Sequence, residues 1–252
     1  MSTDIPKPQS EVVSSNITKL PELTFWRRLY RRIFIWIMRI LVWLFTRTEV
    51  YGVENIPKRG PALIVGNHLG DADLIVGLAV VTISVEIIIK SEIYHTPILG
   101  KLLDAYGVIW IHRGQPDRRA IRATFQGFEE GRAISIAPEG RESLTGALEE
   151  GTGGAAYLAY KAKVPILPSA FVGTENAQIF GNLKRFRRSK VTVRIGELFW
   201  LEEYPDRKQA INLGTRQIMQ TIADLLPPEY RGVYSFPEYK ESDDTIVGKD
   251  RI

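Results

Sequence analysis

The sequence predicts an α/β fold with a mixed, largely parallel sheet flanked by helices, preceded by an N-terminal amphipathic helical segment. After Pro57, short apolar runs alternate with longer stretches of helical pattern, which is typical of a layered fold with a largely parallel sheet. The chain of 252 residues is long enough for one large domain with its own core. Its 44% of hydrophobic and 25% of charged residues are ordinary for a globular protein, so wholesale disorder is not expected.

The individual elements follow from the spacing of apolar residues. Short apolar runs bounded by turn residues predict strands at Ala62 to Gly66, Val85 to Lys90, Val108 to His112, Ala133 to Ala137, Ile166 to Val172 and Val191 to Gly196. Longer patterned stretches predict helices at Asp73 to Thr82, Asp117 to Gly131, Gly153 to Lys163 and Arg207 to Leu226. The sheet and its helices therefore fall within residues 48–235, the main predicted domain.

The two ends of the chain differ from this domain in composition. Residues 1–20 are polar, rich in Ser and Pro, and lack the basic start, apolar stretch and cleavage site of a secretory signal. Residues 236–252 form a second polar segment, which is charged from Glu241 onward. We expect a mobile tail at 1–20 and a disordered polar tail at 236–252.

A helix within residues 21–47 has the pattern of a membrane-surface helix. The segment FWRRLYRRIFIWIMRILVWLF has no Gly or Pro, and Arg39 interrupts its apolar run, which falls short of the about 20 residues that a spanning helix needs. At about 100° per residue the arginines share one arc and face away from an apolar side. The arc contains Arg27, Arg28, Arg31, Arg32 and Arg39, and the apolar side contains Leu29, Ile33, Trp36, Ile37, Ile40 and Leu44. This pattern predicts a helix lying among lipid headgroups. Two alternatives are a helix that packs its apolar side on the domain and a single membrane span.

The basic residues are concentrated in two patches. The formal net charge of the chain is +4. Residues 21–47 carry six Arg against one Glu, residues 184–190 add five Lys or Arg, and the remainder of the chain is acidic, at −6. Two basic patches on an otherwise acidic chain point to an anionic surface as the partner, rather than to general nucleic-acid binding.

Cysteine and histidine are scarce. The chain has no cysteine, which excludes disulfides, thiolate metal sites and thiol nucleophiles and fits an intracellular location. A His-rich metal centre would need nearly all of the three histidines, so we expect neither a metal nor a cofactor. His95 and His112 are assigned to structure, because neither is expected to have a carboxylate at a suggestive local spacing.

His68 and Asp73 are candidates for acid–base chemistry. They lie in the run NHLGDAD, directly after the strand predicted at Ala62 to Gly66. Residues five apart would diverge by about 140° on one helix, but the two side chains can meet if His68 ends the strand, Gly70 reverses the chain and Asp73 begins the next helix. A carboxylate that orients a neutral imidazole can activate an alcohol. The alternative is that Asp71 or Asp73 only caps the helix, and the local pattern does not choose between them.

Three further blocks follow in order: GVIWIHR at 107–113, APEGRES at 137–143 and VPILP at 164–168. Together with NHLGDAD, they make residues 48–200 similar to the glycerolipid acyltransferase family of the 1-acylglycerol-3-phosphate acyltransferase type. The resemblance implies a glycerol-3-phosphate acyltransferase-like fold, with His68 as general base and Asp73 as its partner. The prolines of VPILP are interpreted as rigid packing.

The resemblance also implies a set of substrate-binding residues: Lys90, Arg113, Glu139, Gly140 and Arg141. Arg113 follows a predicted strand, and a guanidinium there is suited to bidentate phosphate binding. In the family the third block usually has Thr and Arg where this chain has Arg141 and Glu142. Either Arg141 replaces the usual arginine one position early, or that contact is missing, and Glu142 is expected to weaken phosphate binding unless it points away.

By this resemblance, the chain is expected to move a fatty acyl group from acyl-CoA or acyl carrier protein to the 2-hydroxyl of lysophosphatidic acid, which gives phosphatidic acid. The expected location is the cytoplasmic face of the membrane, as a peripheral or monotopic protein with phospholipid as a partner. The alternatives are another lysolipid acceptor, a lipid thioesterase or hydrolase, and a noncatalytic membrane-binding scaffold.

Overall fold

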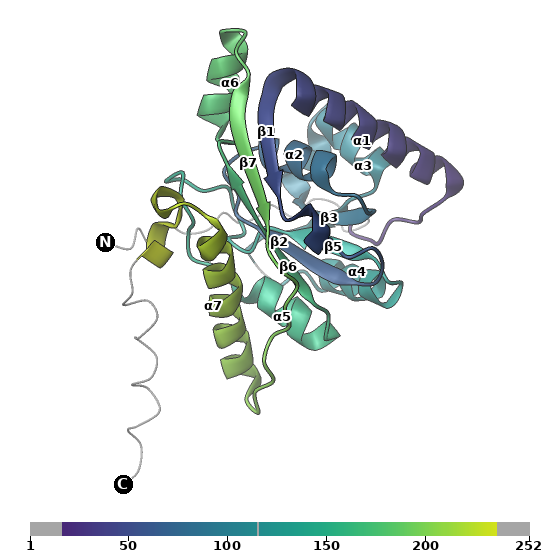
Figure 1. The fold of residues 1–252 in the computed structure, drawn as a ribbon. Coiled ribbons are helices and arrows are strands. Elements are labelled where there is room, and N and C mark those ends of the chain that lie inside the picture. Colours follow the sequence, from purple (N-terminus) through teal and green to yellow (C-terminus); the bar gives the residue numbers. More distant parts are fainter. Residues whose placement is uncertain (1–16, 115, 236–252) are drawn as a thin grey trace.

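A seven-stranded sheet with helices on both faces forms the centre of the molecule (Figure 1). The computed structural model describes residues 17–114 and 116–235. The strands are β1 (Thr46–Tyr51), β2 (Ala62–Gly66), β3 (Val85–Lys90), β4 (Ile109–Ile111), β5 (Ala133–Ile136), β6 (Ile166–Val172) and β7 (Ser189–Ile195). The α-helices are α1 (Phe25–Phe45), α2 (Ala72–Val80), α3 (Leu99–Tyr106), α4 (Arg118–Glu129), α5 (Gly153–Ala162), α6 (Asn176–Lys184) and α7 (Arg207–Leu225).

The sheet is mixed and mostly parallel, as predicted. Its strand order is β1-β7-β6-β2-β5-β3-β4. The pairing of β6 with β7 is antiparallel and all other neighbours are parallel, so β1 and β7 run against the other five strands. The four parallel neighbours β2, β5, β3 and β4 bring the residues that follow them to one edge of the sheet, where open α/β sheets bind their ligands.

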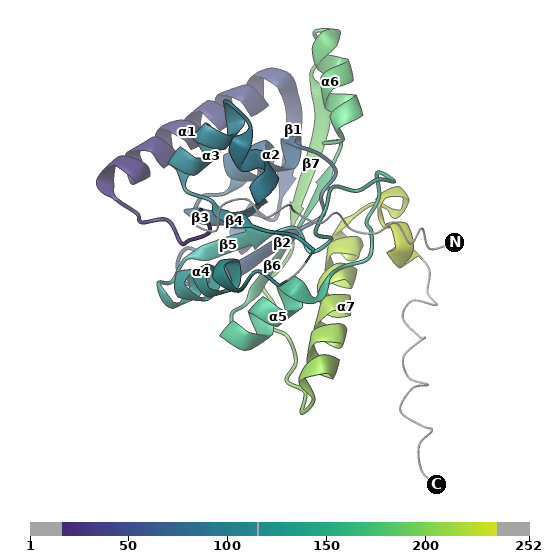
Figure 2. The ribbon, with the colours of Figure 1, turned by 180° about the vertical axis from the view of Figure 1, so that it is seen from behind.

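Two hydrophobic cores cover the two faces of the sheet. Successive side chains of a strand point to opposite faces, so in β2 Leu63 and Val65 enter one core while Ile64 enters the other. Helices α4, α5 and α7 cover the first core, and α1, α2 and α3 cover the second (Figures 1 and 2). The layered fold therefore follows from continuous apolar runs in the inner strands, whose successive side chains fill the cores on both faces.

Six strands and four helices occur where the sequence predicted them, with ends displaced by at most two residues. Among the strands and α-helices of the described residues, three were not predicted: β1, α3 and α6. Helix α1 spans the helical stretch FWRRLYRRIFIWIMRILVWLF expected within residues 21–47, and β1 begins directly after it because Thr46 caps α1: its Oγ1 donates to the carbonyl of Val42 at 2.6 Å.

Residues 17–20 pack against the domain, although they were assigned to the mobile tail. Thr18 is buried, and Ile17 and Leu20 contact the two hydrophobic cores. The rest of that predicted tail, residues 1–16, and the predicted C-terminal tail at 236–252 lie outside the described residues.

Helix α1 turns its apolar side outward. Arg31 and Met38 are buried against the domain, and Tyr30 and Phe34 pack on the α2–α3 core. The predicted apolar side, Leu29, Ile33, Trp36, Ile37, Ile40 and Leu44, is exposed, each side chain by at least 37%. This overturns the alternative in which the apolar side packs on the domain. Within residues 17–114 and 116–235 we find no helix whose length and apolar character suffice to cross a membrane.

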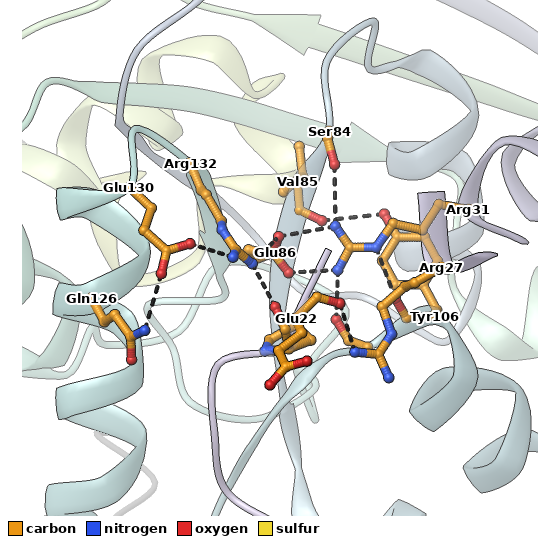
Figure 3. A network of polar contacts seen from close by, with 12 residues as sticks. Glu22, Arg27, Arg31, Ser84, Val85, Glu86, Tyr106, Gln126, Glu130 and Arg132 are labelled. Atoms are coloured by element: carbon orange, nitrogen blue, oxygen red, sulfur yellow. Dashed lines mark hydrogen bonds and ion pairs between the residues drawn. The ribbon is translucent and has the colours of Figure 1, made fainter. Parts of the chain in front are cut away.

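A buried ionic network joins α1 to the sheet (Figure 3). Arg31, predicted to face phosphate or water, instead bonds both carboxylate oxygens of Glu86 on β3, at 2.9 and 2.6 Å. It also donates to the carbonyls of Tyr106 and Gly107, both at 2.8 Å. Arg132 approaches the same carboxylate from the other side at 3.2 Å. These bonds fix the axial position and rotation of α1 on the domain.

Candidate active site

His68 and Asp73 meet at the end of β2. The Nδ1 atom of His68 lies 2.9 Å from Oδ2 of Asp73, and the same oxygen accepts the backbone N–H groups of Leu69 and Gly70 at 2.7 and 3.0 Å. Asp71, at the start of α2, is exposed and makes no side-chain capping bond. The structure therefore brings Asp73, and not Asp71, against His68.

Gly70 is required by close packing rather than by its dihedral angle. A Cβ atom there would lie 2.8 Å from both the carbonyl oxygen of Thr174 and the side-chain oxygen of Asn176. That distance is shorter than any ordinary contact, so a side chain at this position would push the loop away from the segment that precedes α6. The turn that brings Asp73 back to His68 depends on this approach.

The protonation state of His68 is set by competing effects. Burial alone would lower the pKa of His68, but the hydrogen bond and charge of Asp73, together with the charges of Glu142 and Glu139, outweigh burial and raise the pKa above its usual value. When the ring is neutral and its Nδ1–H donates to Asp73, the lone pair is on Nε2. One third of the side chain remains exposed, enough to reach a substrate.

Glu139 lies beneath the His68 loop. It is 0% exposed, Oε1 accepts the backbone N–H of His68 at 2.9 Å, and Oε2 accepts that of Glu149 at 2.7 Å. Burial raises the pKa of Glu139 to about 7, although both backbone N–H groups and the charge of His68 act in the opposite direction. Glu139 thus holds the backbone of His68 in place, and its role in substrate binding stays a prediction.

The loop that follows β5, here called the β5 loop, makes further contacts through Gly140 and Ser143. The backbone N–H of Ser143 donates to the carbonyl of His68 at 2.7 Å. Gly140 has a positive φ of 73° in the turn that follows β5. The turn directs the carbonyl of Gly140 toward Arg113, whose Nη1 lies 3.5 Å away.

Arg113 and Lys90 lie at the ends of two further strands on the same edge. Arg113 follows β4, and its Nη2 lies 2.7 Å from Oε1 of Glu92. Lys90 is the last residue of β3 and is exposed. The topology thus places two predicted substrate-binding residues on the sheet edge at which β2 also ends and His68 lies.

Arg141 and Glu142 have carboxylate and amide partners. Arg141 lies 2.7 Å from Oε2 of Glu149, with both side chains mostly buried. Glu142 accepts a hydrogen bond from Asn176 at 3.0 Å, and its charge contributes to the raised pKa of His68. Where the family usually has Thr and Arg, this chain therefore has Arg141, which is paired with a carboxylate, and Glu142, whose negative charge acts on His68 in addition to that of Asp73.

His112 and Asp117 form a pair that the sequence analysis missed. Nδ1 of His112 lies 2.9 Å from Oδ2 of Asp117, and the backbone N–H of His112 donates to the same oxygen at 3.1 Å. His112 was expected to have no carboxylate at a local spacing that suggests a pair, and this expectation was wrong. Asp117 follows His112 by five residues, the same spacing as between His68 and Asp73. Burial opposes ionisation of Asp117, but the hydrogen bonds from His112, Ala120 and Arg119 lower its pKa.

Metal ligands are not grouped in this region. Among the residues that the structure describes, no cluster of three or more His, Asp or Glu side chains is arranged to hold a metal ion.

Comparison with known proteins assigns the chain to a family. The model of the acyltransferase family matches residues 47–172, half of the chain, and this segment contains His68, Asp73, Arg113 and Glu139. The chain belongs to the acyltransferase family. The resemblance predicted from the four sequence blocks is therefore confirmed.

Individual relatives carry more specific names. A 1-acyl-sn-glycerol-3-phosphate acyltransferase from Borreliella burgdorferi is 30% identical over 143 residues, which are 55% of this chain and 57% of that protein. A Bacillus subtilis protein of the same name is 25% identical over 75% of this chain and 92% of its own length. The crystal structure of the 1-acyl-sn-glycerophosphate acyltransferase PlsC from Thermotoga maritima has the same fold, with a TM-score of 0.59 and 21% identity over 81% of this chain and 84% of that one.

Proposed function

We propose that the chain transfers a fatty acyl group from acyl-CoA or acyl carrier protein to the 2-hydroxyl of lysophosphatidic acid, which gives phosphatidic acid. The observation that carries the proposal is the His68–Asp73 pair, at 2.9 Å, on the sheet edge that also presents Arg113. The names of the relatives from Borreliella burgdorferi and Bacillus subtilis support lysophosphatidic acid as the acceptor.

In the proposed mechanism His68 is the general base. Its Nε2 takes the proton of the acceptor hydroxyl while the hydroxyl oxygen attacks the thioester carbonyl carbon of the donor. Asp73, held by three donors, orients the imidazole and stabilises the imidazolium that forms. The tetrahedral intermediate then collapses, the C–S bond breaks, and His68 returns the proton to the thiolate. The products are the ester and the free thiol, and no covalent enzyme intermediate is needed.

The acceptor phosphate is proposed to bind among the cations at this edge. Arg113 and Lys90 lie at the ends of β4 and β3, and a planar guanidinium can bind two phosphate oxygens at once. Arg113 is paired with Glu92 and Arg141 with Glu149, so a phosphate competes with these carboxylates for the guanidinium groups. Glu142 adds negative charge beside His68, which favours acceptors with fewer phosphate charges and keeps another lysolipid as the second candidate.

Helix α1 is proposed to dock this acyltransferase on a bilayer, as a peripheral or monotopic protein of the cytoplasmic face. Its exposed apolar side would enter the acyl region of one leaflet, and exposed Arg28 and Arg32 on one flank would meet the headgroups, while Arg39 donates to the carbonyls of Ala79 and Val81. The buried Arg31–Glu86 pair supports the proposal, because it holds the helix with its apolar side facing away from the domain.

The test is an acyl-transfer assay with the purified chain in liposomes, using labelled acyl-CoA or acyl carrier protein and a panel of lysolipids. We expect labelled phosphatidic acid from the wild type and a loss of about 100-fold or more in the His68→Ala variant. His95→Ala is the matched control, since His95 is exposed and lies outside the proposed machinery, and it should retain activity.

Three other outcomes would change the proposal. Acylation of a different lysolipid would correct the acceptor and leave the mechanism intact. Release of free fatty acid without any ester product would replace the transferase with a hydrolase. Equal activity in the wild type and the His68→Ala variant would remove His68 from the mechanism.

A further inference from the structure

The turn between α6 and β7 presents an aromatic ring to the outside of the molecule. The last residue of α6, Lys184, and the four residues before β7, Arg-Phe-Arg-Arg at 185–188, are together called the basic turn, and Phe186 at its centre is 99% exposed. All four neighbouring cations are exposed as well. In Figures 1 and 2, α6 projects beyond the sheet beside the start of β7.

Phe186 occupies a backbone position that favours glycine. Its φ is +52°, and it lies one residue beyond the C-cap of α6. Its N–H donates to the carbonyl of Leu183 at 3.1 Å, and the N–H of Arg187 donates to that of Asn182 at 2.9 Å. These two bonds form a Schellman motif, in which glycine is the usual residue at this place. A bulky side chain is disfavoured here, and its exposed ring contributes no packing in return, so the ring is better explained by an external partner.

The basic turn is attached to the end of α1. The guanidinium of Arg188 donates to the carbonyl of Thr46 at 2.8 Å and to that of Trp43 at 2.6 Å. A shallow groove of about 340 Å³ adjoins these contacts and is lined by Arg188, Arg39, Val42 and Trp43, among others. Exposed Phe180 and Leu183 on α6 extend the apolar surface. The turn and the outward side of α1 are therefore two parts of one surface.

We propose that the basic turn is a second membrane contact, in which Phe186 inserts into an anionic bilayer while the cations at 184, 185 and 187 bind lipid phosphates. This inference rests on the proposed docking of α1 and adds a second point of attachment, which would set the tilt of the domain on the bilayer. Charge complementarity supports it: within the part of the chain that the structure describes, Lys184, Arg185 and Arg187 form no salt bridge.

An acidic acyl carrier protein is the competing partner for a basic turn. The apolar surroundings favour the bilayer, because the fully exposed ring and the neighbouring apolar surfaces of α6 and α1 match an acyl layer beneath a layer of phosphates. A carrier-protein site would need the cations but gives no reason for the ring to extend beyond them.

Site-specific labelling tests the insertion directly. The chain has no cysteine, so Phe186→Cys introduces one labelling site for an environment-sensitive fluorophore. Trp200→Cys is the matched control, because Trp200 is also exposed but follows β7, whose seven residues, about 23 Å, separate it from the basic turn. With phosphatidylglycerol vesicles, we expect a blue shift at 186, quenched by nitroxide-labelled lipids, and neither effect at 200. The same response at both positions, or at neither, would overturn the proposal.

Vesicle binding by unlabelled variants distinguishes a membrane contact at the basic turn from docking through α1 alone. Phe186→Gly removes the ring and relieves the positive φ, so its Tm should be equal to or above that of the wild type while vesicle binding weakens by about tenfold. Arg185→Gln and Arg187→Gln should each weaken binding to anionic vesicles by roughly fivefold at low salt. Trp36→Ser removes an exposed ring of α1 as the comparison.

The set of variants that lose vesicle binding shows which surface contacts the bilayer. If Trp36→Ser reduces vesicle binding and the Phe186 and Arg variants do not, α1 docks alone and the basic turn is not a membrane contact. If none of the variants changes vesicle binding, both proposals fail. If the Arg variants lose affinity for acyl carrier protein but keep their affinity for vesicles, the basic turn is a carrier-protein site and the bilayer proposal is wrong.

Discussion

The guanidinium of Arg31 lies 2.6 Å from the carboxylate of Glu86, and the two side chains are only 4% and 1% exposed. This pair joins a helix whose outward side is apolar to β3, the strand next to the edge strand β4. Removing two charges from water is costly, and the cost is recovered only when the hydrogen bonds of both groups are satisfied. Here Arg31 makes further bonds to Ser84 and to the carbonyls of Tyr106 and Gly107.

Arg31→Met should lower the free energy of unfolding by about 3 to 5 kcal/mol, because it leaves the buried carboxylate of Glu86 with fewer donors. Urea denaturation measures this loss. Arg28→Met is the control, since Arg28 is exposed on the same helix and its replacement should change stability by about 0.5 kcal/mol or less. The double variant Arg31→Met with Glu86→Met should lose less than the sum of the two single variants. A single-variant loss below that of Arg28→Met would contradict a stabilising role for the pair.

Asp73→Asn should reduce kcat by about 100-fold or more, because an amide neither fixes the tautomer of His68 nor stabilises the imidazolium. Asp71→Asn is a matched change two residues away on the exposed start of α2, and it should leave kcat near the wild-type value. The rates of acyl transfer to the preferred lysolipid by the two variants, measured in steady state and in single turnovers, test this prediction. If the two variants lose activity equally, Asp73 does not act through His68.

The pH dependence of kcat/KM should report the raised pKa of His68. The base must be neutral, so activity should fall as pH decreases through this pKa. Glu142→Gln removes one of the charges that raise the pKa but keeps an oxygen for the hydrogen bond from Asn176. The acidic limb of the profile should therefore move to lower pH in this variant. An unchanged limb, or one moved to higher pH, would contradict the electrostatic role of Glu142.

Most of the fold could be predicted because strong apolar periodicity marks the buried elements. Two of the missed elements, β1 and α6, lack that signal. Strand β1 is an edge strand with exposed Arg47 and Glu49 in alternation, and α6 buries no residue completely. The orientation of α1 was also hard to infer, since Arg31 was expected to face phosphate or water with the other arginines. Only its partner Glu86, on a strand 55 positions later, explains why one of them is buried.

The contact between His68 and Asp73 could be predicted from the sequence, because both residues lie in the short turn between β2 and α2. The orientation of Glu139 and the pairing of Arg141 with Glu149 could not be inferred, since they depend on how the long loop after β5 folds on itself and against the backbone of His68. The pair of His112 and Asp117 was available from the sequence: its spacing equals that of His68 and Asp73, and Asp117, like Asp73, is the first residue of a predicted helix.

Asp117 should influence acceptor binding through the loop that carries Arg113. Its Oδ2 holds the backbone and ring of His112, and its Oδ1 caps α4 through the N–H groups of Arg119 and Ala120. Asp117→Ala should therefore raise the KM for the lysolipid several-fold with a smaller change in kcat, and should cost about 1 kcal/mol of stability from the lost cap.

Two further variants separate the positioning of Arg113 from helix capping. Asp206→Ala removes the matching N-cap of α7, which bonds the N–H of Gln209 at 2.6 Å, so it should cost similar stability without changing KM. Asp117→Ser keeps a capping oxygen but is too short to reach the ring of His112, so it should retain stability and still raise KM. If Asp117→Ser restores the wild-type KM, the cap alone positions the loop, and the contact with His112 has no part in acceptor binding.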